Sequence, residues 1–286
     1  MQKKGQQMSY QGFFSIMRPM NAIVAGLAAV IGYFIATSTI IPAVVLLVII
    51  VFLVTGGGNV INDYYDSEID AINRPDRPIP SGKVRKETAF HFAAVLFISG
   101  IVLSLFTNPL CAGIAVFNSA VLVLYASRLK KSFMLGNIAV SYLSASIFLF
   151  GGALSGPEGL LLLAPLSLIT FLAMMSRELL KDAEDVEGDK ASGAVTCPIR
   201  HGISTTIWVS LFFILGAILA SIVPVRLWGE WYLFGIGIVD LLILYAVVRP
   251  LKCRTPECLR LTRATTLLKY GMFASLVVFT LSAVFL

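Results

Sequence analysis

The sequence predicts an all-α membrane protein in which a single domain, residues 1–286, crosses the bilayer nine times. Hydrophobic residues make up 57% of the chain and charged residues only 13%, whereas soluble domains are about half apolar and a quarter charged. Apolar runs of about 20 residues, the length that spans a bilayer, alternate with short polar segments. This composition excludes a disordered chain, a nucleic-acid-binding domain and an ordinary soluble enzyme.

The predicted membrane helices follow one another with short connections. In chain order they cover residues 21–40, 42–62, 88–106, 109–127, 136–155, 160–180, 204–223, 231–248 and 265–286. The second contains Gly56, Gly57 and Gly58, and the fifth contains Gly151 and Gly152. Small residues of this kind let membrane helices approach one another closely or unwind locally.

Basic residues are concentrated in one set of connections. That set comprises the N-terminal segment and residues 63–87, 128–135, 181–203 and 249–264, with the adjoining helix ends. Of the 22 Lys and Arg residues, only Arg226 lies on the other side. Because cytoplasmic loops carry an excess of Lys and Arg, we expect these connections and the N-terminus in the cytoplasm. The basic N-terminal segment has no apolar stretch followed by a cleavage site, so a removed signal peptide is not expected.

Cysteine, histidine and one intramembrane aspartate give weaker indications. The four cysteines are Cys111, Cys197, Cys253 and Cys258. Their spacing resembles no zinc site, and we expect buried thiols rather than a disulfide framework. We expect His91 and His201 to be structural. Asp240, in the eighth predicted helix, has either a functional role or a polar contact between helices, and the sequence does not decide between them.

Two acidic clusters lie where apolar helices enter the cytoplasmic side. Asp63, Asp66 and Asp70 match a second trio at a constant offset of 119 residues, formed by Asp182, Asp185 and Asp189. Further on, a proline and a glycine match at an offset of 120, as Pro78 with Pro198 and Gly82 with Gly202. We interpret this similarity as an internal repeat that relates residues 59–82 to residues 178–202.

The spacing within each trio places its carboxylates on one side of a helix. At about 100° per residue, the three aspartates fall within about 60° of one face, and Asn59 joins the first trio. A solvated acidic surface is one interpretation. The repetition favours binding of a hard cation, because Mg²⁺ is held by one or two carboxylates together with phosphate oxygens of a substrate. Two facing clusters could hold two ions bridged by a diphosphate.

Basic side chains near both clusters suggest a polyanion site. They are Arg74, Arg77 and Lys83 after the first cluster, Arg128, Lys130 and Lys131 between the fourth and fifth helices, and Arg177, Lys181 and Lys190 around the second cluster. Attraction to anionic lipid headgroups would explain individual members of this set equally well. As a group beside carboxylates, they favour phosphate binding.

Four motifs together resemble the intramembrane prenyltransferases of the UbiA family. They are NDYYDSEID at 62–70, RPDRPIPSG at 74–82, YASRLK at 125–130 and RELLKDAEDVEGD at 177–189. The resemblance covers essentially the whole chain. It implies a barrel-like helical bundle around a central apolar cavity, and Mg²⁺-dependent transfer of an isoprenoid chain from a diphosphate to an acceptor.

The resemblance also assigns roles to residues. It implies that Asn62, Asp66, Asp70, Asp185 and Asp189 hold the metal and diphosphate, with Asp63 and Asp182 in support. Tyr125 and Lys130 match an element near the diphosphate, while Arg18 and Asn21 match a first-helix element. A metal-assisted leaving group and an apolar cavity that excludes water agree with this chemistry.

Within that family, the pattern is most similar to the archaeal-type digeranylgeranylglyceryl phosphate synthases. This similarity implies geranylgeranyl diphosphate as donor and geranylgeranylglyceryl phosphate as the lipid-like acceptor. Acceptors such as chlorophyllide, homogentisate or hydroxybenzoate remain alternatives. A divalent-cation transporter is a remote alternative, because repeated carboxylates occur in transporters but arginines should not line a cation pathway. The pattern contains no obvious general base and does not predict an oligomeric state.

Overall fold

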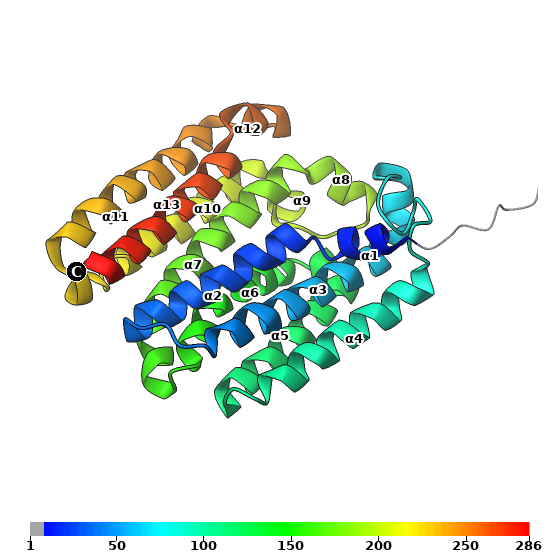
Figure 1. Cartoon of the computed structure of the whole chain (residues 1–286). Helices are drawn as coiled ribbons and strands as arrows, with labels where there is room; N and C mark the ends of the chain where they lie inside the picture. Colours follow the sequence, from blue (N-terminus) through cyan, green and yellow to red (C-terminus); the bar gives the residue numbers. More distant parts are fainter. Residues whose placement is uncertain (1–8, 286) are drawn as a thin grey trace, which may run out of the picture.

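The computed structural model describes residues 9–285 as an assembly of helices (Figure 1). The first eight residues, which include part of the basic N-terminal segment, lie outside the described residues. The elements in chain order are α1 (Tyr10–Ile16), α2 (Pro19–Thr37), α3 (Val44–Asn73), α4 (Lys86–Ser104), α5 (Pro109–Ser127), η1 (Leu129–Lys131), α6 (Leu135–Ala153), α7 (Pro157–Glu184), α8 (Val186–Ala191), α9 (Cys197–His201), α10 (Ile203–Ala220), α11 (Val225–Val248), η2 (Arg249–Lys252), α12 (Pro256–Thr262) and α13 (Ala264–Phe285).

Nine helices within residues 9–285 are long and apolar enough to cross a membrane, which confirms the predicted number. Their ends agree with the sequence-based ranges to within a few residues, apart from two helices that run further and one that begins earlier. α3 continues to Asn73 and α7 to Glu184, beyond the apolar stretches that define them in the sequence. α11 begins at Val225, ahead of a kink at Gly229. The two extended helices carry the aspartate clusters beyond the apolar part of the bundle.

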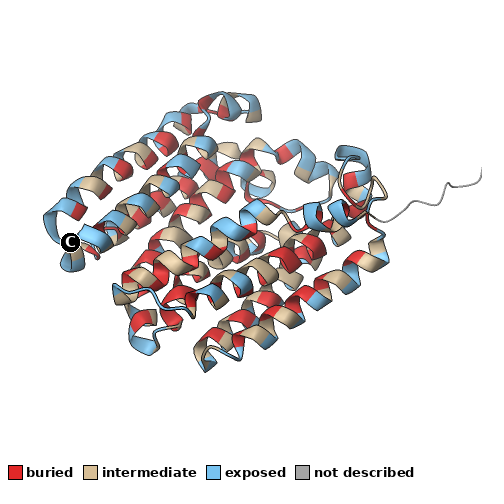
Figure 2. Cartoon of the chain, in the orientation of Figure 1, coloured by how far each residue is buried: buried red, intermediate tan, exposed pale blue. Residues whose placement is uncertain are grey.

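The adjacent helices α2 and α6 lie at the centre of the bundle (Figure 1). α3, α4 and α5 pack on one side of this pair, and α7, α10, α11 and α13 pack on the other. The buried apolar residues form two clusters that follow the same division. Figure 2 shows buried positions along the inward faces of the helices and exposed positions along the outward faces. Both halves of the molecule therefore meet at the central pair.

Gly151 of α6 makes the close approach of the central pair sterically feasible. A Cβ atom at this position would lie 2.2 Å from the carbonyl oxygen of Ala29 and 2.8 Å from the backbone nitrogen of Tyr33, both on α2. No side chain can be accommodated at such distances without moving the backbone. The expectation that glycine permits close helix packing is confirmed at this position.

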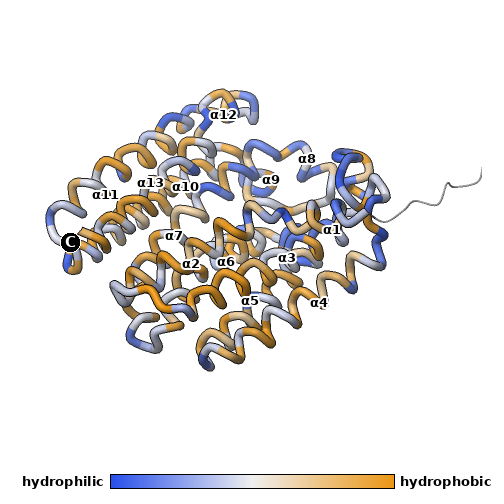
Figure 3. Tube along the Cα trace, viewed as in Figure 1, coloured by the Kyte–Doolittle hydropathy of each residue, from blue (hydrophilic) through white to orange (hydrophobic). Residues whose placement is uncertain are grey.

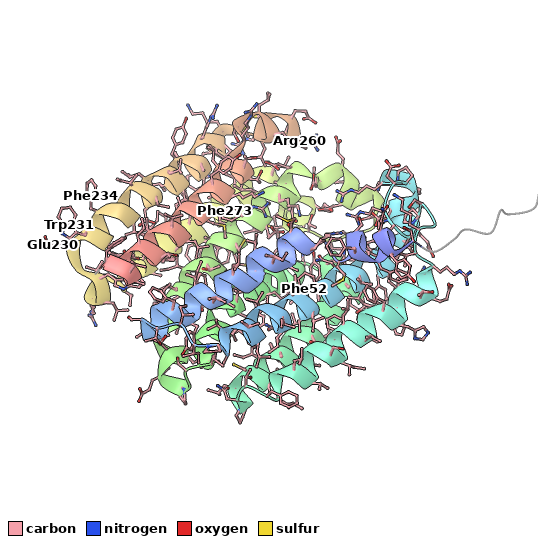
Figure 4. The ribbon with its side chains drawn as sticks, in the orientation of Figure 1. Phe52, Glu230, Trp231, Phe234, Arg260 and Phe273 are labelled. Carbon is pink, nitrogen blue, oxygen red and sulfur yellow. A yellow bond between two sulfur atoms is a disulfide. The ribbon has the colours of Figure 1, made fainter. Side chains whose placement is uncertain are left out.

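The two ends of the bundle differ in chemistry. Hydrophobic segments form its middle, whereas α8 and the connection after α3 are rich in hydrophilic residues (Figure 3). Figure 4 shows Glu230, Trp231 and Phe234 at one end of α11 and Arg260 at the opposite end of the bundle. Trp231 is 77% exposed and Phe234 is 69% exposed. Exposed aromatic side chains near a helix end are typical of membrane–water interfaces.

Two predictions about single residues are resolved. The expectation of free thiols is wrong for Cys253 and Cys258, which form a disulfide, because the turn between η2 and α12 brings their Cα atoms to 5.5 Å. It is confirmed for Cys111 and Cys197, which are buried free thiols. Asp240 of α11 accepts a hydrogen bond of 2.7 Å from the hydroxyl of Ser221 at the end of α10, so it makes the polar contact between helices.

The two histidines lie against aromatic rings. The His91 ring is edge-on to Phe90 at 5.9 Å between centroids, and the His201 ring is edge-on to Phe133 at 5.5 Å. Neither histidine belongs to the carboxylate clusters described below. These contacts support the structural role that we expected for both residues.

Candidate active site

The extended end of α3 carries the first acidic cluster in a network of ion pairs. Asp63 and Asp70 are 3% and 4% exposed. The guanidinium of Arg77 donates to both carboxylates, at 3.1 Å to Asp63 and 2.6 Å to Asp70. Arg18, which precedes α2, donates to Asp63 at 2.7 Å. Buried charges are stable only when paired and hydrogen-bonded, and these two arginines supply the partners.

Asp66 occupies a more accessible place between the other two aspartates. Its side chain is 22% exposed and accepts hydrogen bonds from Lys130 and, at 3.0 Å, from Asn62. Lys130 lies on η1, after α5, so this pair connects the end of α3 to the α5–α6 connection. The sequence-predicted residues Asn62, Asp66 and Lys130 therefore lie together.

The second cluster differs from the first in its backbone. The expectation that Asp182, Asp185 and Asp189 share one helical face is wrong, because α7 ends at Glu184 and Asp185 has non-helical dihedral angles. Asp182 lies on α7, Asp185 at the junction and Asp189 on the short helix α8.

Contacts from α12 and α13 explain where α7 ends. The last carbonyl groups of a helix have no partner inside it. Arg260 of α12 donates to the carbonyl oxygen of Glu184, and the Thr265 hydroxyl of α13 donates to the Glu184 carboxylate at 3.0 Å. Arg260 thus satisfies the last carbonyl group of α7, and Thr265 fixes the Glu184 side chain where the chain turns at Asp185.

The carboxylates of the second cluster have few cationic partners. Asp182 accepts a hydrogen bond of 2.8 Å from the Asn137 amide of α6. Within residues 9–285, no basic side chain lies within ion-pair distance of Asp185 or Asp189. Partial burial and then the neighbouring charge of Asp185 raise the pKa of Asp189 above its usual range. A carboxylate in these surroundings favours a bound cation.

The α5–α6 connection links the two clusters. Lys130 of this connection pairs with Asp66 of the first cluster, and Tyr125 lies just before it, near the end of α5. Val195, which follows α8, also donates a backbone hydrogen bond of 2.9 Å to Lys131 in the α5–α6 connection. The segments that carry the two clusters therefore both contact the α5–α6 connection.

The donor set of this region fits a magnesium ion that is shared with a substrate. Within residues 9–285, no group of three or more acidic, His or Cys side chains is close enough to hold a metal ion by itself. Mg²⁺ keeps several waters and takes only one or two carboxylates when phosphate oxygens complete its shell. Asp66, Asp185 and Asp189 are suitable ligands by this criterion, because Asp66 is more accessible than Asp63 and Asp70 although it pairs with Lys130, and the other two have no basic partner among the described residues.

Two apolar chambers open beside the central helix pair. The α3–α5 chamber, of about 410 Å³, is bounded by α2, α3, α5 and α6, and Asn59 and Tyr125 contribute to its lining. The α7–α13 chamber, of about 500 Å³, is bounded by α2, α6, α7 and α13 and includes Arg177 and Lys269. Asn21 and Ser144 line both chambers. Cavities of this size are typical of small-molecule sites.

The other sequence-predicted residues divide into two groups. Asn21 and Asn59 line chambers, and Asn59 also donates to the Met17 carbonyl oxygen at 2.8 Å. Arg177 and Lys181 lie on α7 near the second cluster, and both pair with Glu178. Five further basic residues form no ion pair with the aspartates within the part of the chain that the structure describes: Arg74, Lys83, Arg128, Lys131 and Lys190.

Sequence reasoning missed two polar residues of the site. Asn137, near the start of α6, is 7% exposed and holds Asp182. Glu178 is 8% exposed, and its carboxylate forms ion pairs with Arg177 at 2.5 Å and with Lys181 at 3.8 Å. A polar side chain within an apolar helix is a signal that could have singled out Asn137. Glu178 lacks such a signal, because many charged residues surround it in the sequence.

Comparisons with known proteins agree with this architecture. Residues 22–279 match the model of the UbiA prenyltransferase family. Digeranylgeranylglyceryl phosphate synthase of Methanoregula boonei is 58% identical, over 98% of this chain and 100% of that protein. The synthase of the same name from Methanoculleus marisnigri is 52% identical, over 97% of this chain and 100% of that protein.

Solved structures extend the comparison to three dimensions. A structure of a digeranylgeranylglyceryl phosphate synthase superposes with a TM-score of 0.86 at 38% identity, covering 96% of this chain and 99% of that chain. A UbiA homologue from Archaeoglobus fulgidus, bound to GPP and Mg²⁺, has a TM-score of 0.67 at 14% identity, covering 92% and 99%. This chain therefore belongs to the UbiA prenyltransferase family.

Proposed function

We propose that this prenyltransferase transfers a geranylgeranyl group from geranylgeranyl diphosphate to the glycerol hydroxyl of geranylgeranylglyceryl phosphate. The product would be digeranylgeranylglyceryl phosphate, a precursor of ether lipids. The observation that carries the proposal is that the α5–α6 connection contacts both aspartate-bearing segments, through Lys130 to Asp66 and through Lys131 to Val195, while Tyr125 lines the adjoining apolar chamber. Relatives matched over their whole length at 58% and 52% identity, named for this synthase activity, support the choice of substrates.

The site residues divide the work of binding the donor. Asp66 from α3, with Asp185 and Asp189 beyond α7, would ligate Mg²⁺, and Lys130 would face the diphosphate. When bound, Mg²⁺ neutralises charge that develops on the leaving diphosphate. We propose two such ions, in keeping with two carboxylate groups and one bridging diphosphate. The Mg²⁺ and GPP in the Archaeoglobus fulgidus homologue support this choice of metal and donor class.

The proposed reaction exchanges one bond for another. The bond between the allylic carbon and the diphosphate oxygen breaks, and an ether bond forms between that carbon and the glycerol oxygen. The hydroxyl proton leaves with a weak base, for which a diphosphate oxygen is sufficient, because the allylic cation is a strong electrophile. The apolar walls of the α3–α5 chamber would keep water from this cation.

The chain is an integral membrane protein, and we propose the cell membrane as its location. The concentration of Lys and Arg around the aspartate clusters supports a cytoplasmic orientation for the active site and the N-terminus. A cation transporter is not favoured, because Arg18 and Arg77 occupy the carboxylates of the first cluster.

A direct test incubates the purified protein with Mg²⁺, labelled geranylgeranyl diphosphate and a panel of acceptors. We expect a labelled product with geranylgeranylglyceryl phosphate, identified by mass spectrometry. Asp66→Ala and Asp185→Ala should abolish turnover in protein that still folds, whereas Glu68→Gln should retain it, because the Glu68 side chain is 93% exposed. Product only with an aromatic or chlorin acceptor, or metal uptake into vesicles without prenyl diphosphate, would contradict the proposal.

A further inference from the structure

Two chambers that share part of their lining suggest that the two hydrocarbon chains of the reaction occupy separate spaces. The shared positions are Asn21 and Ala25 of α2 with Ser144 and Ile147 of α6. A hydroxyl in one chamber and an allylic carbon in the other can meet at this boundary. The charges of the two linings then indicate which substrate belongs in which chamber.

The α3–α5 chamber has no charged side chain in its lining. Its polar groups are neutral and include Tyr125 and also Asn59, which lies one helical turn before Asp63 on α3. A prenyl chain fits this uncharged space while its diphosphate remains outside with the metal. The α3–α5 chamber therefore suits the donor.

The α7–α13 chamber has a different character, with two basic and no acidic side chains among its lining residues. Arg177 lies on α7 and Lys269 on α13, while the remaining walls are mostly apolar and include Phe273 (Figure 4). A space that pairs positive charge with hydrocarbon walls, and that offers no carboxylate for a metal, suits a lipid whose head is a phosphate monoester.

The register of α7 and α13 places Arg177 and Lys269 at a similar depth in the bundle. Thr265 of α13 bonds to Glu184 of α7, and the helices run in opposite directions from that contact. At 1.5 Å per residue, Lys269 lies about 6 Å and Arg177 about 10 Å further into the bundle. Side chains of this length can bridge the remaining difference and reach one phosphate group.

Both cations have capacity for a ligand. Within the described residues, no carboxylate lies within ion-pair distance of Lys269. Arg177 donates through Nη1 to Glu178, and a guanidinium has four further N–H groups, in a geometry that matches phosphate. Glu178 also attracts Lys181 at 3.8 Å, so it does not neutralise Arg177 alone.

We propose that the α7–α13 chamber binds the acceptor lipid, with Lys269 and Arg177 holding its phosphate without a metal ion. This inference rests on the proposed function and adds a specificity determinant, because an acceptor without a phosphate would lose these contacts. Lys269 is a binding residue in this scheme, and its removal should affect the acceptor rather than the donor.

The test measures steady-state kinetics of the full-length protein with two acceptors, geranylgeranylglyceryl phosphate and geranylgeranylglycerol. Lys269→Gln should raise the KM for the phosphorylated acceptor about tenfold or more, as expected for a lost charge-assisted hydrogen bond. The KM for geranylgeranyl diphosphate and the rate with the unphosphorylated acceptor should not change. Lys269→Arg should restore most of the affinity, and Lys252→Gln, outside both chambers, is the matched control.

A second pair of variants tests the chamber assignment without changing charge. Val24→Phe narrows only the α7–α13 chamber, and Val51→Phe narrows only the α3–α5 chamber. The first should raise the KM for the acceptor and the second the KM for the donor. If Lys269→Gln fails to fold, these two variants still test which substrate each chamber binds.

The outcomes separate this inference from the function on which it rests. If the wild-type protein makes no product from geranylgeranylglyceryl phosphate, the proposed function fails. If it makes the product but Lys269→Gln leaves the KM for the acceptor unchanged, Lys269 serves only to reach lipid headgroups and the inference is overturned. Effects of Val24→Phe on the donor alone would overturn the chamber assignment.

Discussion

Arg77 is the residue that most directly connects stability to the site. Its guanidinium bridges Asp63 and Asp70, which are almost fully buried, and Arg18 adds a second contact to Asp63. Four charged groups in a confined space are stable only while their charges compensate one another. Asp66, in contrast, is more exposed and remains accessible to a ligand.

Arg77→Met should lower the free energy of unfolding by about 3 kcal/mol, because it leaves two buried carboxylates with too little positive charge. Arg74→Met is the matched control, since Arg74 is exposed and its substitution should change stability by less than about 0.5 kcal/mol. Thermal or urea unfolding in detergent, followed by circular dichroism, measures the difference. Equal stability of the two variants would show that Asp63 and Asp70 do not depend on Arg77.

Residue types near the site could be predicted, but not their pairing. The D-x-x-D-x-x-x-D spacing selected the first three aspartates through helical periodicity, which is local, and its repetition selected the other three, although those do not share one helix. The contact of Arg18 with Asp63 joins positions 45 residues apart and depends on how α2 meets α3. Likewise, Lys130 reaches Asp66 over 64 residues. Such choices depend on tertiary packing, which spacing does not encode.

At the scale of elements, α3 and α7 show why apolar runs underestimate some helices. Both continue well beyond their apolar residues, since helical hydrogen bonds extend through polar sequence as long as side chains find partners. The break at Asp185 arises from contacts with Arg260 and Thr265, which lie about 80 residues away in the sequence. The single domain and the internal repeat remain predictions, which the matching roles of α3 and α7 support.

Gly151→Ala should destabilise the protein by about 1–3 kcal/mol, because the added Cβ would collide with the backbone of α2 and the central pair would have to separate. Gly113→Ala on α5 is the matched control. A Cβ there meets nothing within 4 Å, and alanine favours a helix by about 1 kcal/mol over glycine. Unfolding in the same detergent compares them, and equal or reversed effects would contradict the close packing of α2 with α6.

At the scale of the whole molecule, polar residues and the aspartate clusters lie at the same end of the bundle. Polar segments gather at the end of the bundle that carries the aspartates, and Trp231 and Phe234 mark the opposite end (Figures 3 and 4). The fold class and the number of crossings were predictable because they follow from composition and from the alternation of apolar runs with polar segments. The division into two chambers was not, since it depends on the pairing of α2 with α6.

Single cysteines should report the orientation of the chain in the membrane. In a background with the four native cysteines replaced by serine, Asp76→Cys should react with an impermeant maleimide only in inverted vesicles. Glu230→Cys should react only in right-side-out vesicles, because it lies at the end of the bundle opposite the aspartates. Both positions are exposed. Labelling of both cysteines from one side would contradict the predicted topology.

Binding of an unreactive thio-analogue of geranylgeranyl diphosphate tests the central claim most directly, because that claim places one metal-bound diphosphate between two helix ends. Calorimetry with and without Mg²⁺ would compare the wild-type protein with Asp66→Asn, Asp185→Asn and the double variant. We predict that either single substitution removes most of the Mg²⁺-dependent gain in affinity, and that the double variant loses little more. Full Mg²⁺-dependent affinity in either single variant would show that one helix end is sufficient and would contradict the shared site.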